Sequence, residues 1–278
     1  MPDEAVAGVY GFRITGVQDN RDLLVDAQPD WPLLEVTSRV GRVDQRVTVV
    51  SEQHAELKLI EGITARLDRS PLRVEFIMPT PLASKAIVHP FLSGVVPIHC
   101  HWMGRTSLHG GAFIHDNRAW AILGDREGGK STLLAQLAAQ GLPIVADDLV
   151  VLEDDMVYAG PRSIDLRVNP AQGMGPAEFI GRVGARERWR IQLGPIPSQV
   201  PLGGFFFLEW SERSEIRRLG GVERMLRISA GRSLMLPLAD PMILPRLAAL
   251  PGWEVLRPAR LEDLPKIAEQ MLQAVAAV

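Results

Sequence analysis

The segment from Gly124 to Thr132 constrains this chain more than any other part of its sequence. It reads Gly-Asp-Arg-Glu-Gly-Gly-Lys-Ser-Thr and fits the phosphate-binding pattern G-x-x-x-x-G-K-[ST] in full. Residues 119–123 before it form an apolar run typical of a buried strand, and residues 131–140 after it have helical periodicity, with Gly141 as a stop signal. This order predicts a site for nucleotide phosphates. The alternative is a glycine-rich turn before a surface helix.

The chemistry of the loop gives each part of it a role. Glycines let backbone N–H groups wrap a phosphate without side-chain clashes, and the helix N-terminus adds its own N–H groups and dipole. Lys130 is predicted to reach the outer phosphates, and the Ser131 hydroxyl is predicted to hold Mg²⁺. The predicted nucleotide-binding residues are Gly124, Asp125, Arg126, Glu127, Gly128, Gly129, Lys130, Ser131 and Thr132.

Two adjacent carboxylates, Asp147 and Asp148, follow residues 144–146, which are typical of the next buried strand. A parallel strand after the loop's helix would bring them near Lys130 and Ser131, because ligands bind at the C-terminal strand ends of open α/β sheets. Neighbouring strand residues point to opposite faces unless the chain turns, so we expect two roles. Asp148 is predicted to bind Mg²⁺, and Asp147 to accept a proton from an attacking hydroxyl. The alternative is a solvated turn.

Three segments together resemble the HPr kinase/phosphorylase family. Residues Ser107–Gly110, the glycine-rich loop and residues Val145–Asp148 resemble its V-H-G, G-K-S and A-D-D segments in the same order. The resemblance covers roughly residues 105–210, and the core is shared more distantly with phosphoenolpyruvate carboxykinases. It implies an α/β fold with a P-loop kinase core of the HPr kinase/phosphoenolpyruvate carboxykinase type.

The resemblance also implies roles for three further residues. Ser163–Arg167 is similar to the family's I-E-I-R-G segment, so Asp165 is expected in the metal shell and Arg167 at the transferred phosphate. His109 is expected near the same phosphate, with a structural histidine as the alternative. The predicted catalytic residues are therefore Asp147, His109, Lys130 and Arg167, and the predicted metal ligands are Ser131, Asp148 and Asp165.

Two differences from the regulatory HPr kinases indicate which branch of the family the chain resembles more. Thr132 stands where those enzymes usually have Glu, and residues 199–208 replace their arginine- and glycine-rich segment. The pattern is more similar to HPr-kinase-related proteins found with lasso-peptide biosynthesis, which phosphorylate a serine of a precursor peptide. This implies a kinase that uses Mg²⁺ and ATP or GTP on a peptide or protein serine. The resemblance also gives a homo-oligomer as an expectation, because HPr kinases form hexamers. The alternatives are an HPr serine kinase/phosphorylase, a small-metabolite kinase and a non-catalytic nucleotide-binding regulator.

Outside the resemblance, the sequence predicts a division at residue 80. Residues 1–80 alternate short β-rich segments with turn residues, which predicts an antiparallel β-rich region, and residues 81–278 are predicted to form the kinase domain. Residues 82–105 are predicted to form a helical connector in which His99, Cys100 and His101 are packing or surface residues. The predicted N-terminal strands are Val9–Thr15, Leu33–Thr37, Arg46–Val50, Ala55–Ile60, Ile63–Asp68 and Leu72–Ile77.

The C-terminal half carries further local signals. Residues 115–117 are predicted to form a hairpin turn, residues 149–158 a hairpin, and residues 205–208 a core strand. The tail from Val222 onward is predicted to be mostly helical, ending in a helix with Pro265 in its first turn. Residues 171–198 are predicted to form a mobile basic loop that clamps phosphate or an acidic peptide, or else a solvated loop; its arginines include Arg182, Arg186, Arg188 and Arg190.

The composition of the chain limits the classes of partner and the compartment that we expect for it. The 278 residues carry a net charge of −3, which does not favour nucleic acid as a partner. The hydrophobic content of 46% and charged content of 23% are ordinary for a globular protein. The single cysteine, Cys100, excludes an intrachain disulfide and fits a reducing compartment. No apolar run approaches the ~20 residues of a membrane span, and residues 1–8 do not resemble a secretion signal. The sequence therefore predicts a cytoplasmic protein without a membrane partner.

Overall fold

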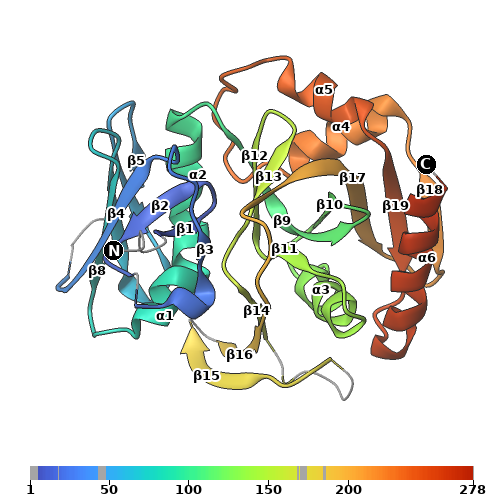
Figure 1. Cartoon of the computed structure of the whole chain (residues 1–278), viewed down its shortest axis with the longest axis horizontal. Helices are drawn as coiled ribbons and strands as arrows, with labels where there is room; N and C mark the ends of the chain where they lie inside the picture. The colour runs from blue at the N-terminus through green and yellow to red at the C-terminus, as the bar shows by residue number, and fades with distance from the viewer. Residues whose placement is uncertain are drawn as a thin grey trace.

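The structure is a computed structural model, and it describes residues 6–17, 19–42, 48–167, 169, 174–183 and 186–277. Two large β-sheets and one three-stranded sheet form its β-structure, so the fold is mixed α/β. The N-terminal sheet lies on one side of the molecule with helix α2 (Leu92–Trp102) beside it, and helix α3 (Lys130–Ala139) accompanies the second large sheet (Figure 1).

The N-terminal sheet confirms a β-rich region but not its predicted pairing. Its strand order is β3-β1-β2-β4-β8-β7-β6-β5, and β4 runs parallel to both β2 and β8. The expectation of a purely antiparallel region was therefore wrong. The strands are β1 (Ala7–Val9), β2 (Phe12–Thr15), β3 (Val25–Asp26), β4 (Leu33–Val40), β5 (Val49–Val50), β6 (His54–Lys58), β7 (Thr64–Asp68) and β8 (Arg73–Met78).

Two predicted strands of this region differ from the observed ones. The strand expected over Val9–Thr15 is two strands, because Tyr10 and Gly11 have φ values of +55° and +78° and turn the chain back on itself. Gly11 suits this turn, since glycine adopts positive φ without steric cost. Of the strand expected over Arg46–Val50, residues 46 and 47 lie outside the described part of the chain.

The predicted helical connector is confirmed, and it packs on the N-terminal sheet. It consists of α1 (Ser84–Ala86), the π-helical segment η3 (Ile87–Phe91) and α2. Phe91 and residues of α2 share a hydrophobic cluster with Phe12 and Phe76 of the sheet, and the cluster extends to Leu149 of the second sheet. Packing thus crosses residue 80, and the division of the chain into two domains there stays a prediction.

The second large sheet is held together by two long strands, β9 and β17. β9 pairs with β12 through its first half and with β10 and β11 through its second half. β17 pairs with β13, β10 and β19 in turn, so that strands β10, β9, β12, β13 and β17 close into a ring. The strands are β9 (Thr106–His115), β10 (Arg118–Gly124), β11 (Ile144–Ala146), β12 (Leu149–Glu153), β13 (Met156–Tyr158), β17 (Gln199–Trp210), β18 (Glu215–Arg218) and β19 (Gly252–Arg257).

Several local predictions for this sheet are confirmed. The turn between β9 and β10 places Asp116 and Asn117 at φ values of +50° and +58°, as a two-residue hairpin turn requires. The strand expected over residues 205–208 lies within β17, and the hairpin expected over residues 149–158 is β12–β13. β10 and β11 both run antiparallel to β9, which lies between them, so they point in the same direction. Their C-terminal ends therefore meet at one edge of the sheet.

The C-terminal tail is less helical than predicted. Strands β18 and β19 flank helices α4 (Gly221–Ala230) and α5 (Ile243–Ala249), and helix α6 (Leu264–Ala276) ends the described chain with Pro265 in its first turn, as predicted. The strand β19 was missed because its apolar run is short. It forms because Trp253 and Val255 are buried, while its backbone pairs with β17. Short 3-10 helices cover Arg21–Leu23, Ile60–Gly62 and Leu261–Asp263.

The expected basic loop is largely a β-hairpin. Strands β14 (Ser163–Leu166), β15 (Glu178–Val183) and β16 (Arg186–Gln192) form the three-stranded sheet, in the order β14-β16-β15. Phe179 and Trp189 lie opposite each other on neighbouring strands, with ring centroids 5.0 Å apart. The loop prediction was wrong because the high charge of this segment concealed these cross-strand aromatic residues. Residues 170–173 and 184–185 lie outside the described part of the chain.

Among the helices of the described residues, none combines the length and hydropathy that a membrane-spanning helix needs.

Candidate functional site

The glycine-rich loop lies between strand β10 and helix α3, as predicted. Gly129 directly precedes the helix at a φ of +75°, and no side chain caps the helix N-terminus. The first amide of the helix with a backbone partner is that of Leu133, which donates to the Gly129 carbonyl at 3.0 Å. A helix leaves its first N–H groups unpaired, so the amides at the start of α3 are free to bind an anion.

A distant arginine completes the loop and was missed at the sequence level. The Arg257 guanidinium lies 4.1 Å from the centroid of the Trp210 ring and donates to the Gly128 carbonyl at 2.8 Å. A Cβ at position 129 would collide with this guanidinium, so the glycine is required there. No local pattern points to Arg257, which is 129 residues away from Gly128.

Lys130 is held against the loop by two hydrogen bonds to backbone carbonyls. Its Nζ donates to the carbonyls of Gly124 and Asp125 at 2.9 and 2.8 Å. The side chain is buried, and this burial lowers the pKa of Lys130. A phosphate on the loop would exchange two carbonyl acceptors for charged oxygens, which form stronger hydrogen bonds with an ammonium group.

The structure brings Asp147 to Ser131. The Ser131 hydroxyl donates to Asp147 Oδ1 at 2.8 Å, whereas Asp147 Oδ2 has no hydrogen-bond partner among the described residues. Asp147 is 1% exposed, and burial together with the neighbouring Asp148 raises the pKa of Asp147. The proximity of strand end and loop predicted from the sequence is therefore observed.

The chain turns at Asp148, and this turn brings the carboxylates of Asp147 and Asp148 toward the same side. Its φ of +67° breaks the strand alternation, so the two carboxylates do not diverge to opposite faces. Ligand atoms of Asp147, Asp148 and His89 all lie within 4.8 Å of one another. Burial raises the pKa of Asp148, but the hydrogen bond and charge of His89 outweigh this effect and lower it.

His89 is a residue of this site that sequence reasoning missed. It lies in η3 and is fully buried, with Nε2 3.3 Å from Asp148 Oδ2 and Nδ1 3.0 Å from Ser163 Oγ. Burial lowers the pKa of His89, but the charges of Asp165 and Asp148 and a hydrogen bond to Asp148 outweigh it and raise the pKa. Its only local signal is a His-Pro pair in an apolar segment, which does not indicate a ligand.

Asp165, which was predicted to be a metal ligand, is paired with Arg190. Its two carboxylate oxygens accept hydrogen bonds from Arg190 Nε and Nη2, both at 2.7 Å. Both side chains are buried, and Arg190 also donates to the His89 carbonyl at 2.8 Å. The pair places Arg190 in strand β16 rather than in a loop, and the role of Asp165 as a metal ligand stays a prediction.

Two other basic residues contact the loop directly. Arg167 and Arg186 both donate to Glu127 Oε1, at 2.9 and 2.7 Å. All three side chains are well exposed, so these ion pairs are weak and replaceable. Arg188 lies on the same hairpin, and its Nε is buried without a hydrogen-bond partner among the described residues.

His109 lies within β9, opposite Leu149 of β12. Its backbone N–H donates to the Gly231 carbonyl at 2.7 Å, which fixes the strand at this point. Burial lowers the pKa of the His109 side chain, and the charge of Lys130 lowers it further. The imidazole is therefore neutral at pH 7, and its catalytic role stays a prediction.

A cavity of about 850 Å³ joins these groups. It is lined by loop residues 126–132, by His109 and Asp148, and by arginines of the β15–β16 hairpin. On another side it is lined by Lys58, Leu59 and Ile60 of the N-terminal region. Gly124, Asp125 and Asp147 do not line it, since Asp147 lies beneath Ser131.

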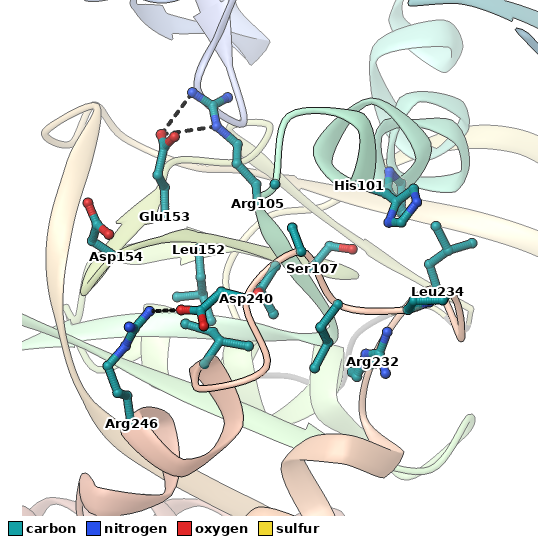
Figure 2. A pocket seen from close by; sticks show the side chains of 17 residues that line it. His101, Arg105, Ser107, Leu152, Glu153, Asp154, Arg232, Leu234, Asp240 and Arg246 are labelled. Atoms are coloured by element: carbon teal, nitrogen blue, oxygen red, sulfur yellow. Dashed lines mark hydrogen bonds and ion pairs between the residues drawn. The ribbon is translucent and has the colours of Figure 1, made fainter. Parts of the chain in front are cut away.

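A second, smaller cavity of about 220 Å³ lies near the C-terminal end of α2 (Figure 2). Most charged groups in it already have partners, since Arg105 pairs with Glu153 and Arg246 pairs with Asp240. Arg232 lines both cavities. Of these two cavities, the larger is the candidate site, because it is lined by residues of the glycine-rich loop and by Asp148.

Comparison with known proteins shows similarity to solved structures only. No protein-family model matches the chain, and no curated protein matches it. Among solved structures, the chain is similar to the HPr(Ser) kinase/phosphatase from Coxiella burnetii, with 17% sequence identity and a TM-score of 0.33 over 62% of this chain and 96% of that chain. Because both the sequence identity and the TM-score are low, the proposed function rests on the geometry of the site.

Proposed function

We propose that this protein is a phosphotransferase that moves the γ-phosphoryl group of a nucleoside triphosphate to a serine hydroxyl of a peptide or protein. The observation that carries the proposal is the hydrogen bond of 2.8 Å between Ser131 and Asp147. It joins the hydroxyl at an uncapped helix N-terminus to a carboxylate at the neighbouring strand end. P-loop phosphotransferases hold Mg²⁺ with these two groups, the Ser or Thr of the loop and an Asp of a neighbouring strand, and the metal neutralises charge on the phosphates.

The residues present fit Mg²⁺ and a nucleotide. The amides at the start of α3 and Lys130 would hold the phosphates, and Ser131 with a carboxylate of the pair would hold the metal. The unpartnered Oδ2 of buried Asp147 supports this fit, because a buried carboxylate oxygen without a donor calls for a cation or water. Mg²⁺ would neutralise charge on the transferred phosphoryl group.

We retain the proposed division of roles between the carboxylates. Asp147, with its free oxygen, would accept the proton of the attacking hydroxyl, and Asp148, which lines the cavity, would bind the metal. The preference for ATP or GTP, a lasso-type precursor as acceptor, assembly into a homo-oligomer and a cytoplasmic location stay predictions that rest on the sequence.

Two asparagine substitutions separate these roles. Asp147→Asn is expected to keep Mg-nucleotide affinity within about threefold but to lower γ-phosphate transfer about 100-fold or more, since it removes a proton acceptor. Asp148→Asn is expected to weaken binding and to raise the Mg²⁺ concentration needed for it. Calorimetric titration with Mg-ATP and Mg-GTP, with phosphate release as the activity readout, measures both effects.

Asp154→Asn, on the exposed β12–β13 turn, is the matched control and should behave like the wild type. The reverse pattern would exchange the two assignments. If neither nucleotide binds the wild-type protein, the proposed function is wrong.

The β15–β16 hairpin is proposed to serve the acceptor. Arg186 and Arg188 line the cavity beside the loop, whereas Arg182 of the same hairpin does not. Arg186→Ala combined with Arg188→Ala is expected to raise the acceptor KM or lower kcat about tenfold, because each arginine would lose a charge-assisted contact. Initial rates on serine peptides found active in a peptide-library screen measure this effect.

Arg182→Ala is the control for that double variant and should leave the rates unchanged. Nucleotide affinity, measured in parallel, should move little. A collapse of nucleotide binding with unchanged acceptor kinetics would place the hairpin in the nucleotide site instead.

A further inference from the structure

The cluster of His89, Asp147 and Asp148 contains an imidazole, which Mg²⁺ sites rarely use. The ligand atoms of the three residues lie within 4.8 Å of one another, and His89 and Asp147 are buried. Asp148 lines the cavity of about 850 Å³, so an ion can reach the cluster from solvent. The cluster thus combines a nitrogen donor, two carboxylates and an entry path, which are the elements of a transition-metal site.

The distance between His89 and Asp148 suits two ligands of one ion. Nε2 and Oδ2 are 3.3 Å apart. A charge-assisted hydrogen bond between them would bring the atoms to about 2.7–2.9 Å. Two atoms that each lie about 2.1 Å from a metal ion, at the angles of octahedral or tetrahedral coordination, are instead about 3.0–3.4 Å apart.

The surroundings of His89 orient its ring as in a metal site. Metal-bound imidazoles commonly donate their second N–H to a hydrogen-bond acceptor, which fixes the ring and its tautomer. A metal ion would replace the proton that the contact with Asp148 favours on Nε2, since a metal-bound histidine is neutral. With the remaining proton on Nδ1, His89 would donate to Ser163 Oγ at 3.0 Å and present the lone pair of Nε2 to the ion. Arg190 anchors the backbone at the same residue through the His89 carbonyl.

An ion pair between His89 and Asp148 does not explain the environment of Asp147. Its Oδ2 is buried and has no hydrogen-bond partner among the described residues. An ion pair between His89 and Asp148 alone would leave this oxygen without a donor, which is unfavourable for a buried polar atom. A metal ion beside it would supply a bound water as the donor, because Mg²⁺ and similar ions keep several waters when protein ligands are few.

We propose that His89 and Asp148, with Asp147 holding a metal-bound water, form a binding site for a divalent transition-metal ion in the nucleotide-free protein. The imidazole makes the site favour Co²⁺ or Zn²⁺ over Mg²⁺, since imidazole suits these transition metals whereas Mg²⁺ prefers oxygen ligands. The site goes beyond the proposed kinase function, because the protein alone supplies its ligands and it needs no nucleotide.

Titration of the nucleotide-free protein with Co²⁺ tests the proposal. We expect binding of one Co²⁺ per chain, with visible absorption bands that report nitrogen and oxygen ligands, and affinity for Co²⁺ at least tenfold higher than for Mg²⁺ by calorimetry. His89→Gln should lower Co²⁺ affinity tenfold or more and should leave Mg²⁺ affinity within about threefold.

Two further variants keep the test decisive. His101→Gln, a histidine on α2 outside the cluster, is the matched control and should bind Co²⁺ like the wild type. Ser163→Ala keeps all three ligand residues but removes the Nδ1 partner, so it should weaken Co²⁺ binding about tenfold even if His89→Gln does not fold.

Wild-type protein that binds no Co²⁺ without nucleotide would overturn the proposal, as would Co²⁺ bands that persist unchanged in both His89→Gln and Ser163→Ala. Nucleotide binding in the presence of Mg²⁺ is measured separately. A failure of the metal site is therefore distinguishable from a failure of the proposed function.

Discussion

Lys130→Ala is expected to lower γ-phosphate transfer about 100- to 1,000-fold while the protein remains folded. The expected loss corresponds to about 3–4 kcal/mol of transition-state stabilisation, as for removal of one positioned donor from developing charge. Among the described residues, Lys130 Nζ donates only to the carbonyls of Gly124 and Asp125. Gly124 is half-buried and Asp125 is exposed, so these carbonyls can bind water instead, and we expect little change in stability.

Phosphate release from Mg-ATP and Mg-GTP measures the activity, and denaturant unfolding followed by circular dichroism measures the stability. Lys85→Ala is the matched control, because Lys85 is an exposed lysine whose contact is a surface ion pair with Asp22. It should keep full activity. A Lys130→Ala protein with wild-type turnover would remove the glycine-rich loop from the reaction and contradict the proposed function.

The parts of the site that the sequence predicts are those set by local order. A buried strand, a glycine-rich loop and a helix follow one another without interruption, so β10, the loop and α3 are predictable from neighbouring residues. The meeting of Asp147 with Ser131 is also predictable, because the strand after the helix runs in the same direction as β10 and ends at the same edge.

The parts that the sequence does not predict depend on residues far apart in the chain. His89 reaches Asp148 across 59 residues, and Arg257 reaches Gly128 across 129. Each contact exists only because the tertiary fold brings two segments together, and neither segment has a spacing that indicates it. The same holds for the parallel pairing of β4 with β2 and β8, which depends on how the sheet is assembled rather than on the strands themselves.

The ion pair of Asp165 with Arg190 gives Asp165 a structural role that its sequence context does not indicate. From the sequence alone, an acidic residue two positions before an arginine, near a phosphate-binding loop, fits a metal ligand as well as it fits a partner for a buried arginine. The structure instead uses its charge to neutralise Arg190, which is buried and would otherwise carry an uncompensated charge. Because Arg190 also holds the His89 carbonyl, the pair supports the backbone of the site at His89.

Asp165→Ala is accordingly expected to lower the free energy of unfolding by about 3–5 kcal/mol, because it leaves the Arg190 guanidinium buried and unpaired. Asp165→Leu combined with Arg190→Met should recover much of that loss, since removing both charges removes the desolvation cost as well. Urea unfolding of the metal-free protein measures both variants. Glu35→Ala, which breaks an exposed ion pair with Arg73, is the control and should cost less than about 1 kcal/mol.

A metal-ligand role for Asp165 leads to the opposite result. Asp165→Ala would then leave the stability of the metal-free protein nearly unchanged, or raise it by relieving repulsion among carboxylates, and would instead abolish metal binding. The doubly substituted protein would bind metal no better than the single variant. If Asp165 serves to neutralise Arg190, the double variant regains stability and, with His89, Asp147 and Asp148 all in place, regains metal binding with it.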